Sequence, residues 1–167
     1  MSANNLTHLD AQGKARMVDI SSKNVTNRIA IAQAIVKLNE NTLRLILENG
    51  MPKGDVLACA RIGAIMAAKR TAELVPLCHT LPLSMVKVDF EIDKAKNLIR
   101  VLTEARCTGR TGVEMEAIIA AQCAAAIIYD MCKAVQRDII IDQVRLLYKN
   151  GGKSGEFKAE GFANVDA

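Results

Sequence analysis

The sequence contains no tryptophan, and aromatic residues make up only 3% of its 167 residues. Many RNA-binding proteins stack bases on aromatic side chains, so this composition argues against that class. The net charge of +4 arises from acidic and basic residues that are interspersed along the chain. Such a mild excess suits an anionic small molecule rather than a nucleic acid, and we expect no nucleic-acid partner.

The cysteines also lack a pattern that would indicate disulfides or structural zinc. There are five, an odd number, and no two have C-x-x-C spacing: Cys59, Cys78, Cys107, Cys123 and Cys132. Free thiols are typical of a reducing compartment, which predicts the cytoplasm of a microbe or the interior of an organelle, with a cytoplasmic protein favoured. No uncharged apolar run reaches membrane-spanning length, and the N-terminus lacks the charged-then-apolar order of a secretion signal. We therefore expect no membrane partner.

The length and composition predict one domain. Half of the residues are apolar and about a quarter are charged, which is enough for a sizeable core in a chain of 167 residues. No internal repeat or linker divides the chain, so a single domain over residues 1–167 is expected. Residues 1–14 and 156–167 are expected to be flexible ends. His8 lies in the first of these and is expected to take no part in function.

The first half of the chain predicts strands followed by helices. Residues 15–20 are a candidate short strand. Residues 28–38 alternate well enough for a strand but contain enough alanine for a helix, and a strand is favoured. Residues 39–48 are typical of a short helix that starts at Asn39 or Asn41 and stops at Gly50. Residues 55–74 predict a long helix, in which Cys59 belongs to a packed stripe of small residues.

The clearest local signal is a hairpin. Residues 85–92 and 98–105 both alternate apolar and polar side chains, and a polar turn separates them. Residues 138–148 are rich in β-branched and apolar side chains, which predicts a further strand. The order helix, two strands, helix, strand predicts an α+β fold of the ferredoxin-like kind, an antiparallel sheet with helices packed on one face.

The longest predicted element is a helix over residues 113–136, which is rich in alanine and apolar on nearly every face. Glu114 and Glu116 stand at its start, while Asp130 and Lys133 share a face near its end. Glu116 and Asp130 are about 21 Å apart along the axis, so a small ligand reaches both ends only where two subunits meet. The alternative is that these charges merely complement the helix dipole.

All three prolines lie beside two loops that carry candidate functional side chains. Lys53, in M-P-K-G-D, is either a solvated turn residue or a lysine that contacts phosphate or transfers a proton. His79, in L-C-H-T-L, is either a core histidine or a side chain held over a ligand. The segment G-G-K-S-G from residue 151 does not fit a P-loop, because Leu147 replaces the required upstream glycine. Lys149 and Lys153 still offer cations to a phosphate.

Five short motifs stand in a distinctive order: K-G-D from residue 53, L-C-H-T-L-P at 77–82, T-G-V-E-M-E-A at 111–117, Y-D-M-C-K-A-V-Q at 129–136 and G-G-K-S-G at 151–155. Together they closely resemble the cyclic pyranopterin monophosphate synthase family, the MoaC-type enzymes of molybdenum cofactor biosynthesis. The resemblance covers nearly the whole chain, and the set is specific although each motif is short. One departure is Met51-Pro52, where family members often have histidine-rich residues.

The resemblance implies a lyase. Its substrate would be (8S)-3',8-cyclo-7,8-dihydroguanosine 5'-triphosphate, and its products would be cyclic pyranopterin monophosphate and diphosphate. It also implies ferredoxin-like subunits that form a hexamer, a trimer of dimers, with active sites at subunit interfaces. No cofactor is implied. A divalent ion such as Mg²⁺ is compatible with a triphosphate substrate, but the sequence has no dedicated cluster of metal ligands.

Matched residue by residue, the resemblance places the catalytic carboxylate on Asp130 and essential lysines on Lys53 and Lys133. The implied substrate-binding positions are Leu77, Cys78, His79, Glu114, Met115, Glu116 and Lys149. Aspartate and lysine suit the chemistry because such pairs act as general acids and bases when their surroundings tune their pKa values. Which lysine donates the proton, and whether Asp130 is its partner or a base, stays open.

A second hypothesis is a non-catalytic ferredoxin-like module that binds a nucleotide or small anion and regulates a partner. It predicts tight binding without turnover, and tolerance of the change Asp130→Asn. A purely structural oligomer is disfavoured, because Lys53, His79, Asp130 and Lys133 lie beside stiff loops or at a helix end, where functional side chains are often held.

Overall fold

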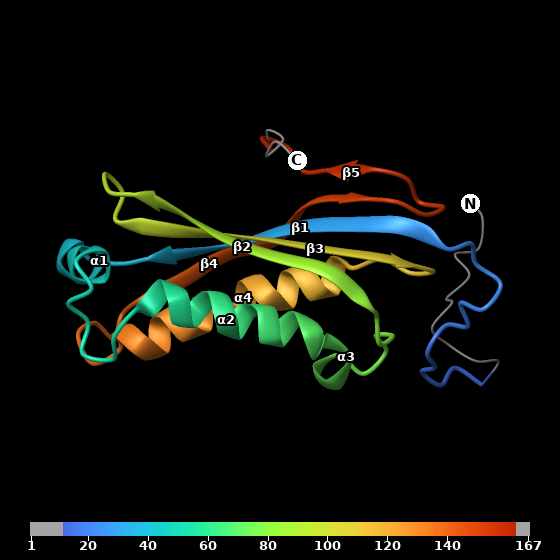
Figure 1. Cartoon of the computed structure of the whole chain (residues 1–167), viewed down its shortest axis with the longest axis horizontal. Helices are drawn as coiled ribbons and strands as arrows, with labels where there is room; N and C mark the ends of the chain where they lie inside the picture. The colour runs from blue at the N-terminus through green and yellow to red at the C-terminus, as the bar shows by residue number, and fades with distance from the viewer. Residues whose placement is uncertain (1–11, 163–167) are drawn as a thin grey trace.

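The computed structural model describes residues 12–162 and shows a five-stranded antiparallel sheet with its long helices on one face (Figure 1). In chain order the elements are β1 (Thr26–Lys37), α1 (Glu40–Leu47), α2 (Val56–Lys69), α3 (Thr71–Leu74), β2 (Leu83–Asp93), β3 (Leu98–Gly109), α4 (Glu114–Cys132), β4 (Ile140–Asn150) and β5 (Phe157–Lys158). The strand order is β2-β3-β1-β4-β5. The βαββαβ succession confirms the predicted ferredoxin-like α+β class.

Small residues set the distance between α4 and the sheet. Ala30, Ala32 and Ala34 alternate along β1 and are fully buried on the helix-covered side. The buried alanines of α4 belong to the same cluster: Ala117, Ala120, Ala121, Ala124 and Ala125. Alanine on both sides lets a helix lie close to a sheet. This explains why residues 28–38 combine a strand's alternation with a helix's alanine content.

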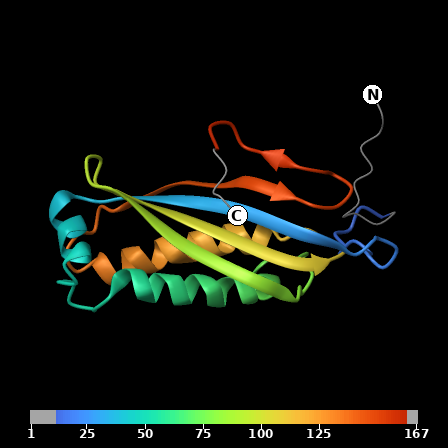
Figure 2. The ribbon, with the colours of Figure 1, turned by 45° about the horizontal axis from the view of Figure 1, so that its top comes forward.

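The two long helices lie side by side under the sheet (Figure 2). Gly63 of α2 makes their close approach possible, since a Cβ atom there would lie 2.1 Å from Cδ1 of Ile127. By length and composition α4 could cross a membrane, but it is packed against α2, β1 and β3, as expected for the core helix of a globular domain.

Three local predictions were wrong. Residues 15–20 contain only an isolated bridge at Ala15, and the Asp19 side chain instead accepts hydrogen bonds from Ser21 in a local turn. Cys59 is exposed because the buried face of α2 follows Val56, Ala60 and Ala64, one residue out of phase with it. The predicted helix over residues 55–74 is broken at Arg70, which separates α2 from α3.

The helix predicted over residues 113–136 ends earlier, at Cys132, with Lys133 as its C-cap. The chain then turns toward β4, and the Gln136 side chain accepts a hydrogen bond of 2.9 Å from the backbone N–H of Asn39. Asn39 in turn caps α1 by accepting from the backbone N–H of Thr42 at 2.7 Å. The end of α4 is thereby fixed to the start of α1.

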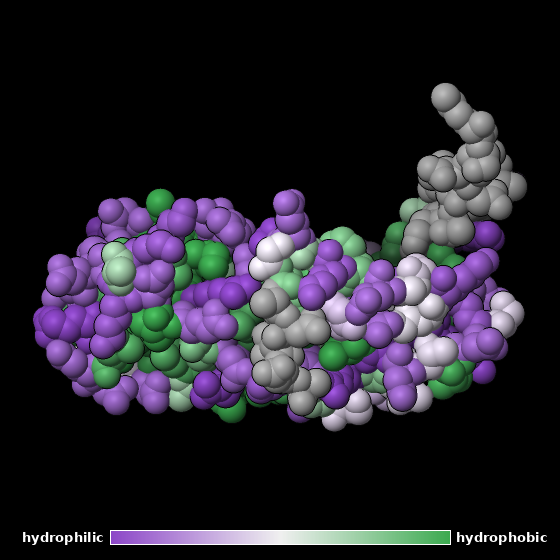
Figure 3. Space-filling model, turned by 90° about the horizontal axis from the view of Figure 1, so that it is seen from above, coloured by the Kyte–Doolittle hydropathy of each residue, from purple (hydrophilic) through white to green (hydrophobic). Residues whose placement is uncertain are grey.

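Within residues 12–162 no helix covers the other face of the sheet, and Figure 3 shows apolar patches among polar side chains on it. Ile31, Leu102 and Leu147 form a second buried cluster on the sheet with Phe162 from the C-terminal segment. That segment also pairs with β4 through β5. Although residues from 156 onward were expected to be flexible, the part up to residue 162 therefore contains a short strand and a buried anchor.

Candidate functional site

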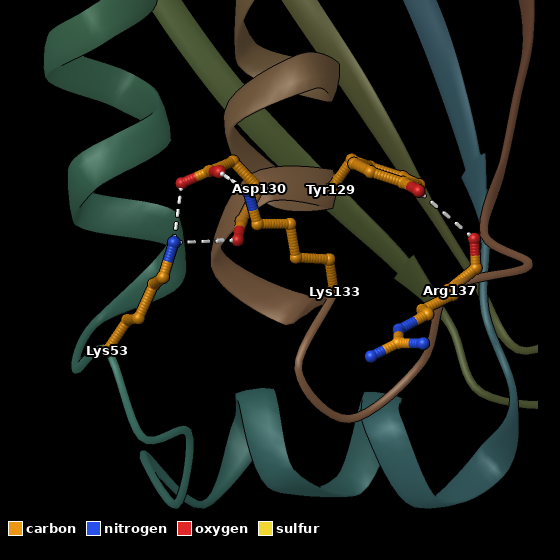
Figure 4. Close-up of polar contacts among 5 residues, drawn as sticks. All are labelled: Lys53, Tyr129, Asp130, Lys133 and Arg137. Carbon is orange, nitrogen blue, oxygen red and sulfur yellow. Dashed lines mark hydrogen bonds and ion pairs between the residues drawn. The ribbon is translucent and has the colours of Figure 1, made fainter.

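Lys53, Asp130 and Lys133 form one hydrogen-bonded cluster where α2 begins and α4 ends (Figure 4). Nζ of Lys53 donates to Oδ2 of Asp130 at 2.7 Å and to its backbone carbonyl at 3.0 Å. Nζ of Lys133 lies 2.7 Å from Oδ1 of the same carboxylate. All three residues were predicted as catalytic, and the structure brings Lys53 to the pair at positions 130 and 133 from 77 residues away.

The two ammonium groups control the charge of this cluster. They lower the pKa of Asp130 to about 2, with the hydrogen bond from Lys133 as the largest cause and that from Lys53 next. Asp130 in turn raises the pKa of Lys133, chiefly through the same hydrogen bond. At neutral pH the carboxylate is therefore ionised and Lys133 holds its proton. All three side chains are about half exposed, so a ligand has direct access to them.

The turn after α4 is braced beside this cluster. The hydroxyl of Tyr129 donates a hydrogen bond of 3.2 Å to the backbone carbonyl of Arg137 (Figure 4). Tyr129 precedes Asp130 in the last turn of α4, so this bond ties the helix end to the segment that leads into β4. The position of the Asp130 carboxylate is thus supported by the helix and by the following turn.

At the opposite end of α4, six of the predicted substrate-binding residues line a cavity of about 340 Å³: Leu77, Cys78, His79, Glu114, Met115 and Glu116. Val18 and Ile20 complete its wall from the N-terminal side. Nε2 of His79 lies 2.9 Å from the backbone carbonyl of Val18, so this nitrogen carries the proton in that hydrogen bond. His79 therefore ties the N-terminal segment to the cavity instead of bonding within its own loop.

A buried carboxyl group lies in this cavity wall. Glu116 is only 4% exposed, and burial raises its pKa, with the neighbouring Glu114 adding to the effect. Burial and the charge of Glu116 also raise the pKa of the Cys78 thiol. Cys78 is therefore a neutral thiol at pH 7, which suits contact with a ligand better than nucleophilic attack. The Glu114 carboxyl folds over Gly112, where a Cβ atom would lie 1.9 Å from Oε2.

A larger cavity of about 840 Å³ adjoins the first and shares Lys23, Thr111, Gly112 and Glu114 with it. Its basic side chains define what we call the cationic cleft: Lys23, Arg28, Arg110 and Lys153. One acidic residue, Glu114, also lines it. Four cations against one carboxylate make this cleft suitable for a polyphosphate.

No sequence pattern predicted Lys23, Arg28 or Arg110 as functional residues. The structure shows why they belong to the cleft: β1 pairs with β3 in antiparallel fashion, and Thr26 lies opposite Gly109. This register places Arg28, near the start of β1, opposite Cys107 near the end of β3. Lys149 was predicted as a substrate-binding residue, and its amine is held near the cleft by Ser154 Oγ at 2.5 Å and the Gly155 carbonyl at 2.7 Å.

The structure does not bring all the predicted residues together within one chain. The cluster of Lys53, Asp130 and Lys133 lies at the C-terminal end of α4, whereas the two adjoining cavities lie at its N-terminal end. Glu116 and Asp130 are about 21 Å apart along the helix. One end offers lysine-bound protons and the other offers room and positive charge for an anionic ligand.

These features define an α+β protein equipped to bind an anionic small molecule and to transfer protons. Comparison with known proteins identifies the group: the chain belongs to the MoaC family, whose sequence profile matches residues 17–152. This confirms the family that the five motifs indicated.

Several relatives are similar over nearly their full length. A protein of Desulfovibrio desulfuricans is 61% identical over 153 residues, which cover 92% of this chain and 94% of the relative. A protein of Chloroflexus aggregans is 56% identical over 159 residues, or 95% and 96% of the two chains. One of Herpetosiphon aurantiacus is 57% identical over 153 residues, or 92% and 93%. All three bear the name cyclic pyranopterin monophosphate synthase.

Proposed function

We propose that this chain is a lyase of molybdenum cofactor biosynthesis. It converts (8S)-3',8-cyclo-7,8-dihydroguanosine 5'-triphosphate into cyclic pyranopterin monophosphate and diphosphate. The observation that carries the proposal is the 56–61% identity, over more than nine-tenths of the chain, to relatives named for this synthase. The proton-holding cluster and the cationic cleft supply the two functions that the reaction needs.

The cluster suggests how protons are handled. Rearranging a purine-derived ring into a pyranopterin requires protons to be delivered to ring nitrogens and hydroxyls. Lys133 is the proposed donor, because its protonated ammonium group is held in place by Oδ1 of Asp130, 2.7 Å away, at the exposed end of α4. Asp130, with a pKa of about 2, is too weak a base to accept a proton at neutral pH. It acts instead as the charge partner that orients Lys133 and Lys53.

The cationic cleft is the proposed site for the triphosphate. Closing a cyclic phosphate with loss of diphosphate builds negative charge on the leaving group, and fixed cations stabilise that charge. The cations in the cleft are Lys23, Arg28, Arg110 and Lys153. Lys149 on β4 lies close by. In the adjoining cavity, His79, Cys78 and Glu116 offer polar groups to the ring system, while Leu77 and Met115 offer apolar contact.

The active site is proposed to form between two subunits. The two ends of α4 are too far apart for one small substrate, and a two-fold pair would bring one chain's cluster to its partner's cavities. The expected assembly is a hexamer built as a trimer of dimers. Assembly through the sheet face is compatible with its apolar patches, which include Ile140, 55% exposed and opposite Lys37 in the ladder.

No cofactor enters this proposal. Within residues 12–162, no group of three or more histidine, cysteine, aspartate or glutamate side chains is arranged to hold a metal ion. A divalent ion that arrives on the triphosphate remains compatible with the reaction.

A cytoplasmic location is also proposed, since all five cysteines are free thiols.

The experiment that tests the function is phosphorus NMR of the purified protein with the cyclised dihydro-GTP substrate. Diphosphate and a cyclic phosphate should appear with the unmodified protein and be lost with Lys133→Ala, Lys53→Ala or Asp130→Asn. The matched control is Lys37→Ala, because Lys37 also pairs with an aspartate, Asp142 at 2.6 Å, but away from the cluster. Substrate that binds but stays intact would favour the non-catalytic regulatory module.

A mixing experiment tests the two-subunit site. Lys133→Ala and His79→Ala should each be inactive, because they damage opposite halves of the site. When equal amounts are dissociated and reassembled together, about a quarter of the sites should receive both intact halves. Recovery of activity near that level is expected. No recovery, despite mixed assembly shown by mass spectrometry, would contradict a site shared between subunits.

A further inference from the structure

Two consecutive glycines follow strand β4 where it runs beside Arg28 of β1. Ile29 lies opposite Asn150 in the ladder, so the turn after Asn150 comes next to Arg28. Gly151 and Gly152 have φ angles of +105° and +77°, a region that residues with a side chain rarely adopt. Gly152 also lines the cationic cleft together with Arg28.

The two glycines are needed for different reasons. A Cβ atom on Gly151 would lie 2.2 Å from the backbone carbonyl oxygen of Asn27, so a side chain there would displace the strand itself. A Cβ atom on Gly152 would instead lie 1.6 Å from Nη1 of Arg28, 2.5 Å from its Cζ and 2.8 Å from its Nη2. The guanidinium group therefore rests on the backbone of Gly152.

A second contact holds the same side chain from the other strand. Nε of Arg28 donates to the backbone carbonyl of Gly109, the last residue of β3, at 3.5 Å. Arg28 is thus bounded by the end of β3 on one side and by Gly152 on the other. A long arginine side chain otherwise has many rotamers, and fixing it beforehand reduces the entropy lost when it binds an anion.

We propose that Gly152 is a positioning residue, whose missing side chain lets the Arg28 guanidinium lie in the cationic cleft ready to bind a phosphate group of a polyphosphate ligand. The inference rests on the proposed function for the identity of that ligand. It predicts that any side chain at position 152 pushes Arg28 out of place while leaving the fold intact, because the obstructed atoms are the free end of a flexible side chain.

The test compares Gly152→Ala with Gly161→Ala. Gly161 has nearly the same φ angle, +75°, but a Cβ atom there would have no neighbour within 4 Å, so the control carries the backbone strain without the collision. Isothermal titration calorimetry with inorganic tripolyphosphate should give a Kd about tenfold higher for Gly152→Ala, and an unchanged Kd for Gly161→Ala. Equal affinity in the two variants would overturn the proposal.

A double-mutant cycle separates positioning from general damage. If Gly152 acts through Arg28, adding Gly152→Ala to Arg28→Ala should weaken tripolyphosphate binding no further. Independent, additive losses would overturn the proposal. In the turnover assay Gly152→Ala should raise KM for the triphosphate substrate and leave kcat largely unchanged, whereas a partly unfolded variant would lower kcat alone.

The positioning role of Gly152 and the synthase function can be refuted independently of each other. If the wild-type protein turns over its substrate but the cycle shows no coupling between Gly152 and Arg28, the positioning role is wrong and the synthase function stands. If the coupling is present in tripolyphosphate binding but no turnover occurs, the polyphosphate site stands and the synthase function is wrong.

Discussion

Replacing either lysine beside Asp130 should raise the pKa of that carboxyl group toward its ordinary value of 3.8. In the wild type each carboxylate oxygen has an ammonium group 2.7 Å away, and the pKa is about 2. Because the Lys133 hydrogen bond is the larger cause, Lys133→Met should raise the pKa more than Lys53→Met. The assay is carbon-13 NMR of the Asp130 carboxyl carbon, titrated from pH 5 to below the wild-type pKa of about 2.

The sign of the effect on stability follows from the same shift. A carboxyl group whose pKa is lower in the folded chain stabilises the fold above pH 3.8, and that stabilisation is lost as the pH falls toward 2. Lys37→Met is the control, since it should affect Asp142 and leave Asp130 unchanged. A wild-type Asp130 that titrates near 3.8, or a larger shift in Lys53→Met than in Lys133→Met, would refute this reasoning.

Three other changes probe packing and burial. Gly63→Ala should lower the free energy of unfolding in urea by about 1 kcal/mol through collision with Ile127, yet stabilise an Ile127→Val background because alanine favours helix. Thr103→Val should cost about 1 kcal/mol in the same assay, since Thr103 is buried and donates to the Ala117 carbonyl at 2.7 Å. Glu116→Gln should raise the thermal midpoint at pH 8, and the gain should vanish below pH 4.5, because burial raises the pKa of Glu116 and disfavours its ionised form.

The sheet and its helices could be predicted because local periodicity and burial agree along most of the chain. The hairpin of β2 and β3 has one apolar face, so its alternation survives in the sequence. The alanines of β1 obscured its identity, since a strand packed closely on an alanine-rich helix needs small side chains at the positions where strands usually carry large ones.

The failures have a common cause: they depend on neighbours that a local pattern does not contain. Residues 15–20 were a candidate short strand, but of this segment only Ala15 is paired. Cys59 lies among small apolar residues, and it faces solvent because the face of α2 that packs in the core follows Val56, Ala60 and Ala64. The end of α4 at Cys132 is likewise fixed by the turn that leads to Gln136 and its bond to Asn39.

The candidate site also contains residues that a local pattern or motif predicts and residues that only the folded sheet brings in. Asp130 and Lys133 were recognisable because three residues on a helix define one face, and Lys53 because a motif resembled a known family. Neither helical spacing nor a family motif indicated Arg28 or Arg110. They enter the cationic cleft through the register of β1 with β3, a contact between residues about eighty positions apart in the sequence. Basic residues at paired strand ends are therefore worth tracing once a sheet order is known.

The separation between the two halves of the site is a fixed property of this fold. Helix α4 is packed against α2 and three strands of the sheet, so its length cannot change without rebuilding the core. If the substrate needs both the proposed proton donor Lys133 and the cavity around Glu116, it must be bound where two chains meet. It follows that turnover per chain should fall on dilution to concentrations at which the assembly dissociates, while the cationic cleft of each separate chain should still bind tripolyphosphate.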